Sequence, residues 1–245
     1  MRILAMDTSN QTMSTAVIED QKILAERTIN VKRNHSVQLM PAIEQVLKDA
    51  ALTLEDMDRI AVAKGPGSYT GVRIAVTVAK TLAWTTSTEL VGVSSLKVLA
   101  GNASPLDESL IVPIMDARRG NLYTGLYTFR EGQLLQLEKD RHVSAEEWVE
   151  IVARRQRESL QPVQVIGADY IKHQELFESK LKGSLLTLPM YQQLPRASVV
   201  AWLGLKEAPV DVHSFVPEYT KLTEAEENWK EANPDQKGGS YIEKY

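Results

Sequence analysis

Residues 6–17 read MDTSNQTMSTAV, and residues 115–126 read MDARRGNLYTGL. Each stretch follows an apolar run, begins with Met-Asp and continues through a polar turn. Each then has a threonine at the same offset, followed by a small residue and an apolar one. Apolar alternation on both sides of a polar turn predicts a β-hairpin. Two hairpins can also resemble each other by chance, but we interpret the match as an internal repeat.

The segments around the two hairpins support a duplication. After the first hairpin, the pattern predicts strands at 22–27, 59–63 and 89–93, with helices in the stretch HSVQLMPAIEQVLKDAAL and from the glycine-rich stretch to Trp84. After the second hairpin it predicts a helix near 145–157 and a strand at 164–167. The order indicates an α/β fold of two similar halves, each a mixed sheet flanked by helices. We expect subdomains at 1–104 and 105–222, and a polar C-terminal helix or tail at 223–245.

Composition limits the classes of function. The 245 residues contain no cysteine, which excludes disulfides, thiolate catalysis and cysteine zinc sites. No apolar run approaches the roughly 20 residues of a membrane span, so we expect a soluble, cytoplasmic protein. The net charge is −4 and the basic clusters are short. Because phosphate neutralisation supplies most of the affinity for nucleic acids, we expect a partner to provide most of any affinity for RNA.

The glycine-rich stretch KGPGSYTGVR, residues 64–73, fits no phosphate or nucleophile motif. The final glycine is followed by Val72 and Arg73 rather than Lys and Ser/Thr, which excludes a P-loop. The dinucleotide spacing fails at Thr70, and Ser68 stands next to a glycine rather than in the middle of a nucleophile elbow. The four histidines form no metal-binding spacing. The glycines therefore indicate a packing surface.

The helices that follow His35 and Gly71 carry wider apolar arcs than one sheet contact needs. Either the two helices cover each other, or they leave a patch for another subunit. We assign Ile74 and Val78 to the core and place Val76 on the sideways extension of the arc. Val76→Glu is therefore expected to disrupt an interface and leave the fold intact.

Several segments together resemble the TsaB (YeaZ) family. These are ILAMDTSNQTMSTAV, NHSVQLMPAIEQVL, KGPGSYTGVRIAVTVAKTLAW, GVSSLKVLA, MDARRGNLYTGLY, PRASVVAWLG and VPEYTKLTEAEENW. The resemblance extends to about Trp229 and implies an actin-like ATPase (ASKHA) fold. TsaB-like proteins are noncatalytic partners of the larger, related TsaD. With a TsaE-like ATPase and a threonylcarbamoyl-AMP synthase, they build threonylcarbamoyladenosine beside the anticodon of tRNAs that read codons starting with A.

The resemblance also sets expectations about chemistry. TsaD-like proteins carry a His-x-x-x-His metal motif where this chain reads Ser94-Ser95-Leu96-Lys97-Val98, so we expect no catalytic and no metal-binding residues. The turn at Asp7, Thr8 and Ser9 corresponds to a phosphate-contacting turn of actin-like ATPases. It either keeps a degenerate phosphate site or merely caps the hairpin. No cofactor of its own is expected, and ATP or ADP at the interface of the complex stays open.

The expected partners are a TsaD-like catalytic subunit and a TsaE-like ATPase, with tRNA reached only through the complex, no membrane contact, and a homodimer when the chain is alone. The expected partner interface consists of His35, Leu39, Met40, Ile43, Tyr69, Gly71, Val72, Arg73, Val76, Ala79, Lys80 and Ala83. Two alternatives are an actin-fold ATPase or kinase relative acting through Asp7 and Asp116, and a peptidase with Ser68 as nucleophile.

Overall fold

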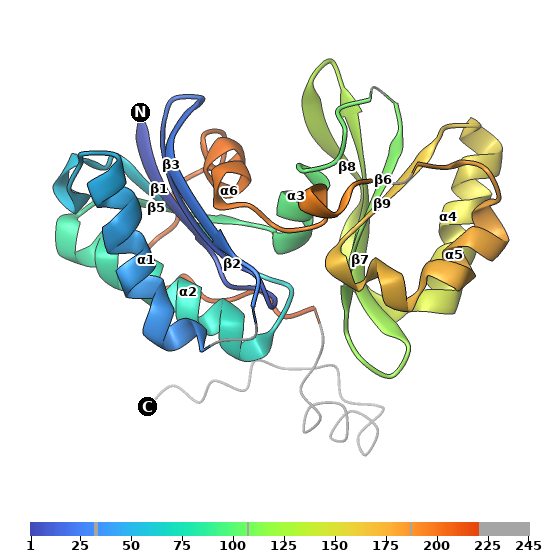
Figure 1. Ribbon diagram of the computed structural model, residues 1–245, viewed down its shortest axis with the longest axis horizontal. Helices are drawn as coiled ribbons and strands as arrows, with labels where there is room; N and C mark the ends of the chain where they lie inside the picture. Colours follow the sequence, from blue (N-terminus) through green and yellow to red (C-terminus); the bar gives the residue numbers. More distant parts are fainter. Residues whose placement is uncertain (32–33, 107, 187, 221–245) are drawn as a thin grey trace.

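The computed structural model describes residues 1–31, 34–106, 108–186 and 188–220, which form two α/β halves side by side (Figure 1). The first half contains β1 (Arg2–Asp7), β2 (Met13–Glu19), β3 (Lys22–Ile29), α1 (His35–Asp49), the 3-10 turn η1 (Leu54–Asp56), β4 (Arg59–Ala63), α2 (Tyr69–Thr86) and β5 (Glu89–Val93). The rest contains α3 (Ser95–Ala100), β6 (Leu110–Asp116), β7 (Asn121–Arg130), β8 (Gln133–Ser144), α4 (Ala145–Ser159), β9 (Val163–Ile166), η2 (Ala168–Lys172), α5 (Gln174–Leu181), β10 (Leu185–Leu186), η3 (Met190–Gln192) and α6 (Ala197–Gly204).

The two sheets have the same topology. The first has the strand order β3-β2-β1-β4-β5, and the second has the order β8-β7-β6-β9-β10. In each, the hairpin of the repeat is antiparallel, and the next two strands add in parallel. The predicted mixed sheets and the duplication are confirmed.

Strand β1 is buried on both faces, which explains its uninterrupted apolar sequence. Leu4 and Met6 pack into the cluster that holds the buried residues of α1 and α2. Ile3 and Ala5 point to the other face, where they join the cluster that contains α6. Figure 1 shows α1 and α2 together on one side of the first sheet and α6 on the other.

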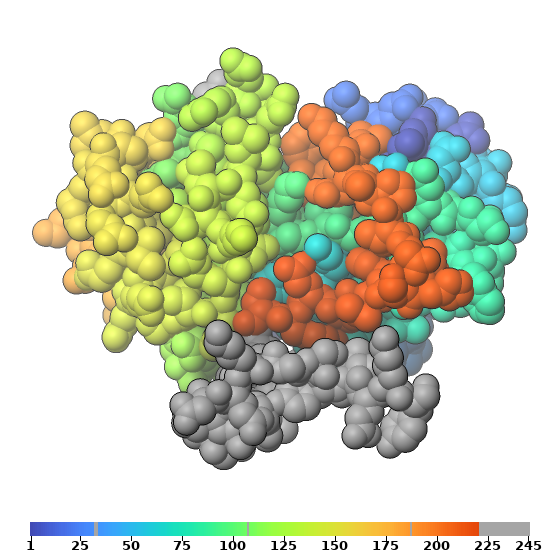
Figure 2. Space-filling model, turned by 180° about the vertical axis from the view of Figure 1, so that it is seen from behind, coloured from blue at the N-terminus to red at the C-terminus, as the bar shows by residue number. Residues whose placement is uncertain are grey.

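Helix α6 returns from the far end of the chain to the first sheet, where it packs against β1 and β2. Its first turn is held by Glu26, whose Oε1 accepts hydrogen bonds from the backbone and hydroxyl of Ser198 at 3.0 and 2.7 Å. Its last turn is held by Arg59, whose guanidinium donates to the Gly204 carbonyl at 2.6 Å. In Figure 2, the orange segment that contains α6 lies over this face of the first half.

The expected subdomain boundaries need a correction. Helix α3 precedes residue 104 but packs against β6 and β7 of the second sheet, whereas α6 precedes residue 222 but packs on the first. The apolar cluster that contains both helices also includes Ile111 and Tyr127. The halves thus share one core, which a division at a linker does not describe. The expected tail at 223–245 lies outside the described residues.

The second sheet contains two strands that the sequence pattern does not indicate, the two-residue β10 and the long β8. Strand β8 is a twelve-residue edge strand whose side chains are mostly half-buried or exposed. Its charged run from Glu138 to Arg141 hides the alternation that marks a strand.

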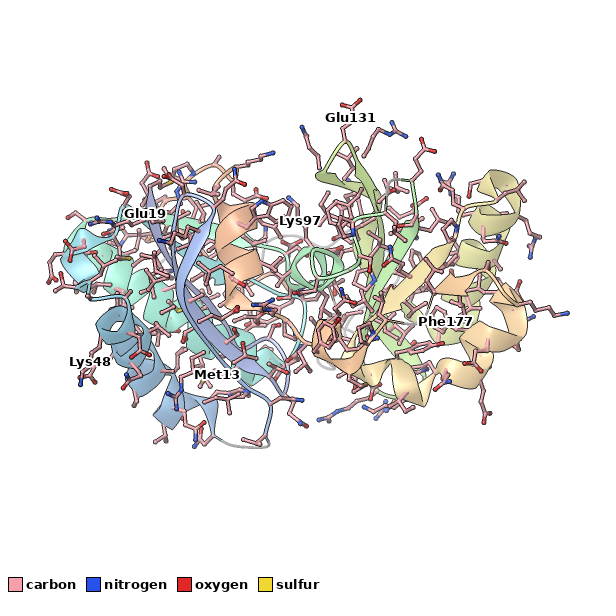
Figure 3. All side chains as sticks on the ribbon, turned by 45° about the horizontal axis from the view of Figure 1, so that its top comes forward. Met13, Glu19, Lys48, Lys97, Glu131 and Phe177 are labelled. Atoms are coloured by element: carbon pink, nitrogen blue, oxygen red, sulfur yellow. The ribbon has the colours of Figure 1, made fainter. Side chains whose placement is uncertain are left out.

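Helices α4 and α5 cover one face of the second sheet. Phe177 is fully buried between α5 and this sheet (Figure 3). Within the described part of the chain, no helix is both long and apolar enough to cross a bilayer.

Candidate functional site

The glycine-rich stretch packs against the turn of the first hairpin. A Cβ at Gly67 would lie 2.3 Å from the Ser9 carbonyl oxygen, and one at Gly71 would lie 2.0 Å from that of Thr8. The Ser68 N–H donates to the Ser9 carbonyl at 2.6 Å, and the Thr8 hydroxyl donates to the Gly71 carbonyl at 2.6 Å. Glycine is needed at both positions because the backbone of this stretch contacts the backbone of the hairpin turn directly, which leaves no room for a side chain. The glycines thus serve packing, as expected.

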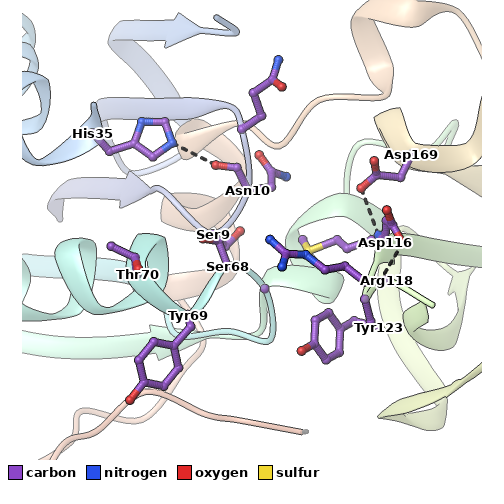
Figure 4. A pocket seen from close by; sticks show the side chains of 14 residues that line it. Ser9, Asn10, His35, Ser68, Tyr69, Thr70, Asp116, Arg118, Tyr123 and Asp169 are labelled. Carbon is purple, nitrogen blue, oxygen red and sulfur yellow. Dashed lines mark hydrogen bonds between the residues drawn. The ribbon is translucent and has the colours of Figure 1, made fainter. Parts of the chain in front are cut away.

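A cleft of about 760 Å³ separates the ends of the two hairpins (Figure 4). Both halves contribute to its wall. The lining residues are Ser9, Asn10, Gln11, His35, Gly67, Ser68, Tyr69, Thr70, Met115, Asp116, Ala117, Arg118, Tyr123 and Asp169. The cleft therefore lies where the repeated turns face each other.

Each repeated turn is stabilised by its own aspartate. The Ser9 N–H donates to Asp7 Oδ1 at 2.7 Å, and the Arg118 N–H donates to Asp116 Oδ1 at 2.9 Å. This is the Asx turn, in which the carboxylate accepts from the backbone two residues later. The repeat therefore preserves a local hydrogen bond as well as a sequence pattern.

Of the three residues expected at the phosphate-binding turn, only Ser9 lines the cleft. Asp7, Thr8 and Ser9 are fully buried, and neither Asp7 nor Thr8 lines the cleft. Burial raises the pKa of the Asp7 carboxyl, against the opposing effect of the Ser9 N–H. Asp7 Oδ2 is buried without a hydrogen-bond partner in the described structure. Asp7 and Thr8 are thus closed off, because the glycine-rich stretch lies against the turn, whereas Ser9 is buried but borders the cleft.

The second turn has a different electrostatic environment. Lys172 Nζ lies 2.7 Å from Asp116 Oδ2 and 2.8 Å from Asp169 Oδ1. Partial burial opposes ionisation of Asp116. The hydrogen bonds from Lys172 and from the Arg118 N–H outweigh it and lower the pKa of this carboxyl. Asp116 is therefore an ionised partner of Lys172.

The peptidase alternative requires a histidine at Ser68, and the geometry does not supply one. Ser68 Oγ accepts from the Gly71 N–H at 3.3 Å and so caps α2. His35 lines the same cleft, but its Nε2 lies 3.0 Å from the Asn10 carbonyl oxygen. His35 Nδ1 has no hydrogen-bond partner in the described structure, so His35 does not pair with Ser68 there. No group of three or more metal-ligand side chains occurs among the described residues.

The expected partner interface is largely inside the chain. Seven of its members are buried in the core of the first half, namely Leu39, Ile43, Gly71, Val72, Val76, Ala79 and Ala83. Val76 is 2% exposed, so the assignment of this residue to a surface was wrong. Met40, Tyr69 and Arg73 are exposed, and His35 and Lys80 are half-buried.

The accessible apolar row of α2 is the one that we assigned to the core, Ile74 and Val78, with Leu82 one turn further. The reason is helix geometry. Ala75, Ala79 and Ala83 form a row of small side chains, which lets α2 approach the sheet closely, so the larger residues of the neighbouring row stay outside. The i, i+4 spacing of the three alanines is visible in the sequence and indicates the side of α2 that lies against the sheet.

Another face of α2 is covered by residues 210–219. Lys80 Nζ donates to the His213 and Phe215 carbonyls at 3.1 and 2.6 Å. Arg73 Nε donates to the Tyr219 hydroxyl at 2.7 Å, and its guanidinium lies 4.0 Å from the centre of the Tyr69 ring. Lys80 therefore holds the 210–219 segment against α2.

Comparison with known proteins adds a family context to this geometry. The family described as tRNA N6-adenosine threonylcarbamoyltransferase (TsaD) matches residues 22–229. The tRNA threonylcarbamoyladenosine biosynthesis protein TsaB of Bacillus subtilis is 44% identical over 95% of this chain and 99% of that protein.

Solved structures show the same fold. YeaZ from Pseudomonas aeruginosa has a TM-score of 0.72 at 23% identity, covering 89% of this chain and 99% of that one. A ROK hexokinase from Thermus thermophilus has a TM-score of 0.51 at 13% identity, covering 84% and 100%. The expected actin-like ATPase fold is confirmed.

Proposed function

The chain belongs to the TsaB family of tRNA threonylcarbamoyladenosine biosynthesis proteins, and from this premise we propose that it serves the pathway as a noncatalytic partner subunit. Its place in tRNA threonylcarbamoyladenosine biosynthesis follows from the family. The proposal adds that it binds and activates a TsaD-like catalytic subunit. The surface for this contact is the outer face of α1 and α2, defined here by Val37, Met40, Ile74, Val78 and Leu82.

The apolar character of this outer face supports the proposal. Val37 is 69% exposed and Met40 is 47% exposed, although both belong to an otherwise amphipathic helix. Ile74, Val78 and Leu82 are only partly covered on the adjoining helix. Stable interfaces bury more than about 1,000 Å² and centre on such apolar side chains. Two helices of 15 and 18 residues offer an area of that order.

The residues after β5 support a noncatalytic role. Ser94 Oγ accepts from the Lys97 N–H at the start of α3, and the Ser94 hydroxyl donates to Asp140 Oδ2. Ser95 Oγ accepts from the Gly65 N–H at 3.1 Å. The segment that carries paired histidines in TsaD-like proteins thus contributes serines that hold the chain's own structure together.

A TsaE-like ATPase completes the proposed complex, and tRNA is reached through the catalytic subunit. The charge supports this division, because a chain of net charge −4 attracts phosphate backbones weakly.

The decisive experiment is co-purification with the TsaD-like subunit. Val78→Glu and Val37→Glu each put an unpaired carboxylate on the outer face, which should weaken a micromolar complex by roughly 100-fold or more. Ile171→Glu is the matched control, because Ile171 is 72% exposed but lies on the other half. Co-elution should be lost for the two outer-face variants and kept for the control.

Thermal melts of the variants alone accompany the binding assay. Normal melting with undiminished binding would place the interface elsewhere.

The enzyme alternative is an ATPase that acts through Asp7 and Asp116. It predicts ATP turnover by the purified chain, whereas the proposed function predicts none.

A further inference from the structure

A separate pocket lies at the β10 edge of the second sheet, where β9, β10, η2, η3 and α5 meet. Its volume is about 310 Å³, and its lining includes the apolar side chains of Val165, Leu185 and Leu188. We propose that this pocket docks a segment of another protein, which inserts an aliphatic or aromatic side chain and places a lysine or arginine beside Glu178. The proposal does not rest on the outer face of α1 and α2, which belongs to the first half (Figure 1).

Several apolar side chains that line this pocket are exposed to solvent. Ile171 is 72% exposed and Met190 is 73% exposed, and Leu186 of the edge strand β10 is 36% exposed. Apolar groups gathered around a hollow on the surface are typical of a site that binds another protein. A small molecule that filled about 310 Å³ would leave this rim in water, whereas a protein segment covers both the hollow and the rim.

The walls of the pocket are fixed by hydrogen bonds of a buried side chain. Gln193 is 5% exposed, and its Oε1 accepts from the Gly167 N–H at 2.7 Å. Its Nε2 donates to the Leu188 carbonyl at 3.1 Å. These bonds tie the segment that precedes α6 to the end of β9. A pocket that exists before binding loses less conformational entropy when a partner docks, so the shape suits recognition of a side chain.

The charge at the rim of the pocket favours a basic partner. Glu178 lines the pocket, and its Oε1 accepts a hydrogen bond from the neutral amide of Gln174 at 2.6 Å. Burial, and after it the negative charge of Glu178, raises the pKa of the Tyr170 hydroxyl, so this charge acts on the pocket wall. Lys180 of the same helix is paired with Glu150 instead. A lysine or arginine of the partner would complement Glu178 and orient the docked segment.

A second copy of the chain fits this pocket less well than a different protein does. In a symmetric dimer the same patch lies on both sides of the contact, so the Glu178 carboxylates of the two copies would approach each other. Like charges brought together at an interface cost free energy. The partner is therefore a different protein, with a basic side chain next to its apolar anchor.

Selection from a library of short random peptides displayed on phage tests the proposal, with the purified chain as the target. The enriched peptides should carry an aliphatic or aromatic residue close to a lysine or arginine. Met190→Lys removes an apolar contact and repels a basic peptide, so it should weaken binding by about tenfold or more in fluorescence anisotropy. Tyr191→Lys is the matched control, because Tyr191 is adjacent and 75% exposed but does not line the pocket. It should change the affinity by less than about threefold.

Charge reversal tests the role of the carboxylate. Selection on Glu178→Lys should favour acidic peptides, whereas Glu175→Lys, on the same helix but outside the pocket lining, should keep the basic preference. Thermal melts should show all four variants folded.

Several results would overturn the proposal. These are no enrichment of any peptide, enriched peptides without a basic residue, and equal affinities of Met190→Lys and Tyr191→Lys. Enriched peptides that match the chain's own sequence at 221–245 would make the chain its own ligand. Self-association that Met190→Lys abolishes and Tyr191→Lys keeps would make a second copy the occupant, which also contradicts the proposal.

Discussion

Asp7 and Asp116 occupy equivalent positions in the repeat and accept the same backbone hydrogen bond, yet their surroundings differ. Burial dominates at Asp7 and raises its pKa from the ordinary 3.8. At Asp116, the Lys172 ammonium and the Arg118 N–H outweigh burial and lower the pKa. The same Asx turn thus holds an aspartate of raised pKa in the first hairpin and one of lowered pKa in the second. The difference arises because only the second turn faces solvent and a lysine.

The opposite shifts predict opposite effects of pH on stability. A raised folded-state pKa means that the native state binds the proton more tightly, so the Asp7 contribution falls as pH rises above about 3.8. A lowered pKa means that the Asp116 contribution is present above about 3.8 and is lost as pH falls through the folded-state value. Relative to wild type, Asp7→Asn should therefore be more favourable at pH 7 than at pH 4, whereas Asp116→Asn should be less favourable at pH 7 than at pH 3. Urea unfolding at these pH values measures both differences, and differences of the same sign would contradict the prediction.

Gly71 provides a second test at this scale. Its missing Cβ leaves room for the Thr8 carbonyl oxygen, which would lie 2.0 Å from an added methyl carbon. Gly71→Ala must push the hairpin turn away from α2, so we expect a loss of several kcal/mol in unfolding free energy. Gly132→Ala is the control, because nothing lies within 4 Å of its Cβ position and only its positive φ is strained. That control should lose about 1 kcal/mol. Equal thermal melts for the two variants would refute the close-approach argument.

Among the elements, α6 depends on polar groups at both of its ends. Arg59 is buried and donates to the carbonyls of Gly204 and Glu207 at 2.6 and 3.1 Å while pairing with Glu89. Arg59→Leu would leave these carbonyls unsatisfied, so we expect a loss of about 2–4 kcal/mol in unfolding free energy. Amide hydrogen exchange should show α6 losing protection first.

The surface pair Arg155–Glu138 supplies the comparison for this prediction. Arg155 is half exposed, so Arg155→Leu should cost less than about 1 kcal/mol. If both substitutions cost the same, then Arg59 does not hold the end of α6.

Most elements could be predicted from periodicity, because hairpins, buried strands and long helices have strong local patterns. The hairpin of 6–17, the strand β5 and the helix α4 occur within a few residues of their expected positions. Two features could not be predicted in this way. Strand β8 is an exposed edge with a charged run, and the return of α6 to the first sheet is set by contacts more than 140 residues apart, such as Arg59 with Gly204.

The candidate site shows the same limit. The sequence indicates that α1 and α2 carry surplus apolar surface, but rotation about the helix axis decides which row is accessible. The small residues of α2 turn toward the sheet, so Val76 is core and Val78 is not. Likewise, the closed turn at Asp7 depends on the glycine-rich stretch lying against it. Tertiary contacts, rather than local pattern, determine both outcomes.

For the whole molecule, the outer face of α1 and α2 has a consequence for assembly. An apolar face that is free in the monomer favours pairing with a second copy, and a symmetric dimer uses the same patch on both chains. If the TsaD-like subunit binds that same face, homodimer and heterodimer exclude each other. We therefore expect the isolated chain to be a homodimer that dissociates as the catalytic subunit is added.

Sedimentation velocity with a fluorescently labelled chain measures this competition. The labelled species should pass from homodimer to a one-to-one heterodimer, with no species that contains two labelled chains and the catalytic subunit. Val37→Glu should make the free chain monomeric and weaken heterodimer formation in the same preparation, because one carboxylate disrupts both contacts. A variant that loses the homodimer but keeps the heterodimer would show two separate surfaces. A larger complex holding two labelled chains would show that the outer face serves only one of the two associations.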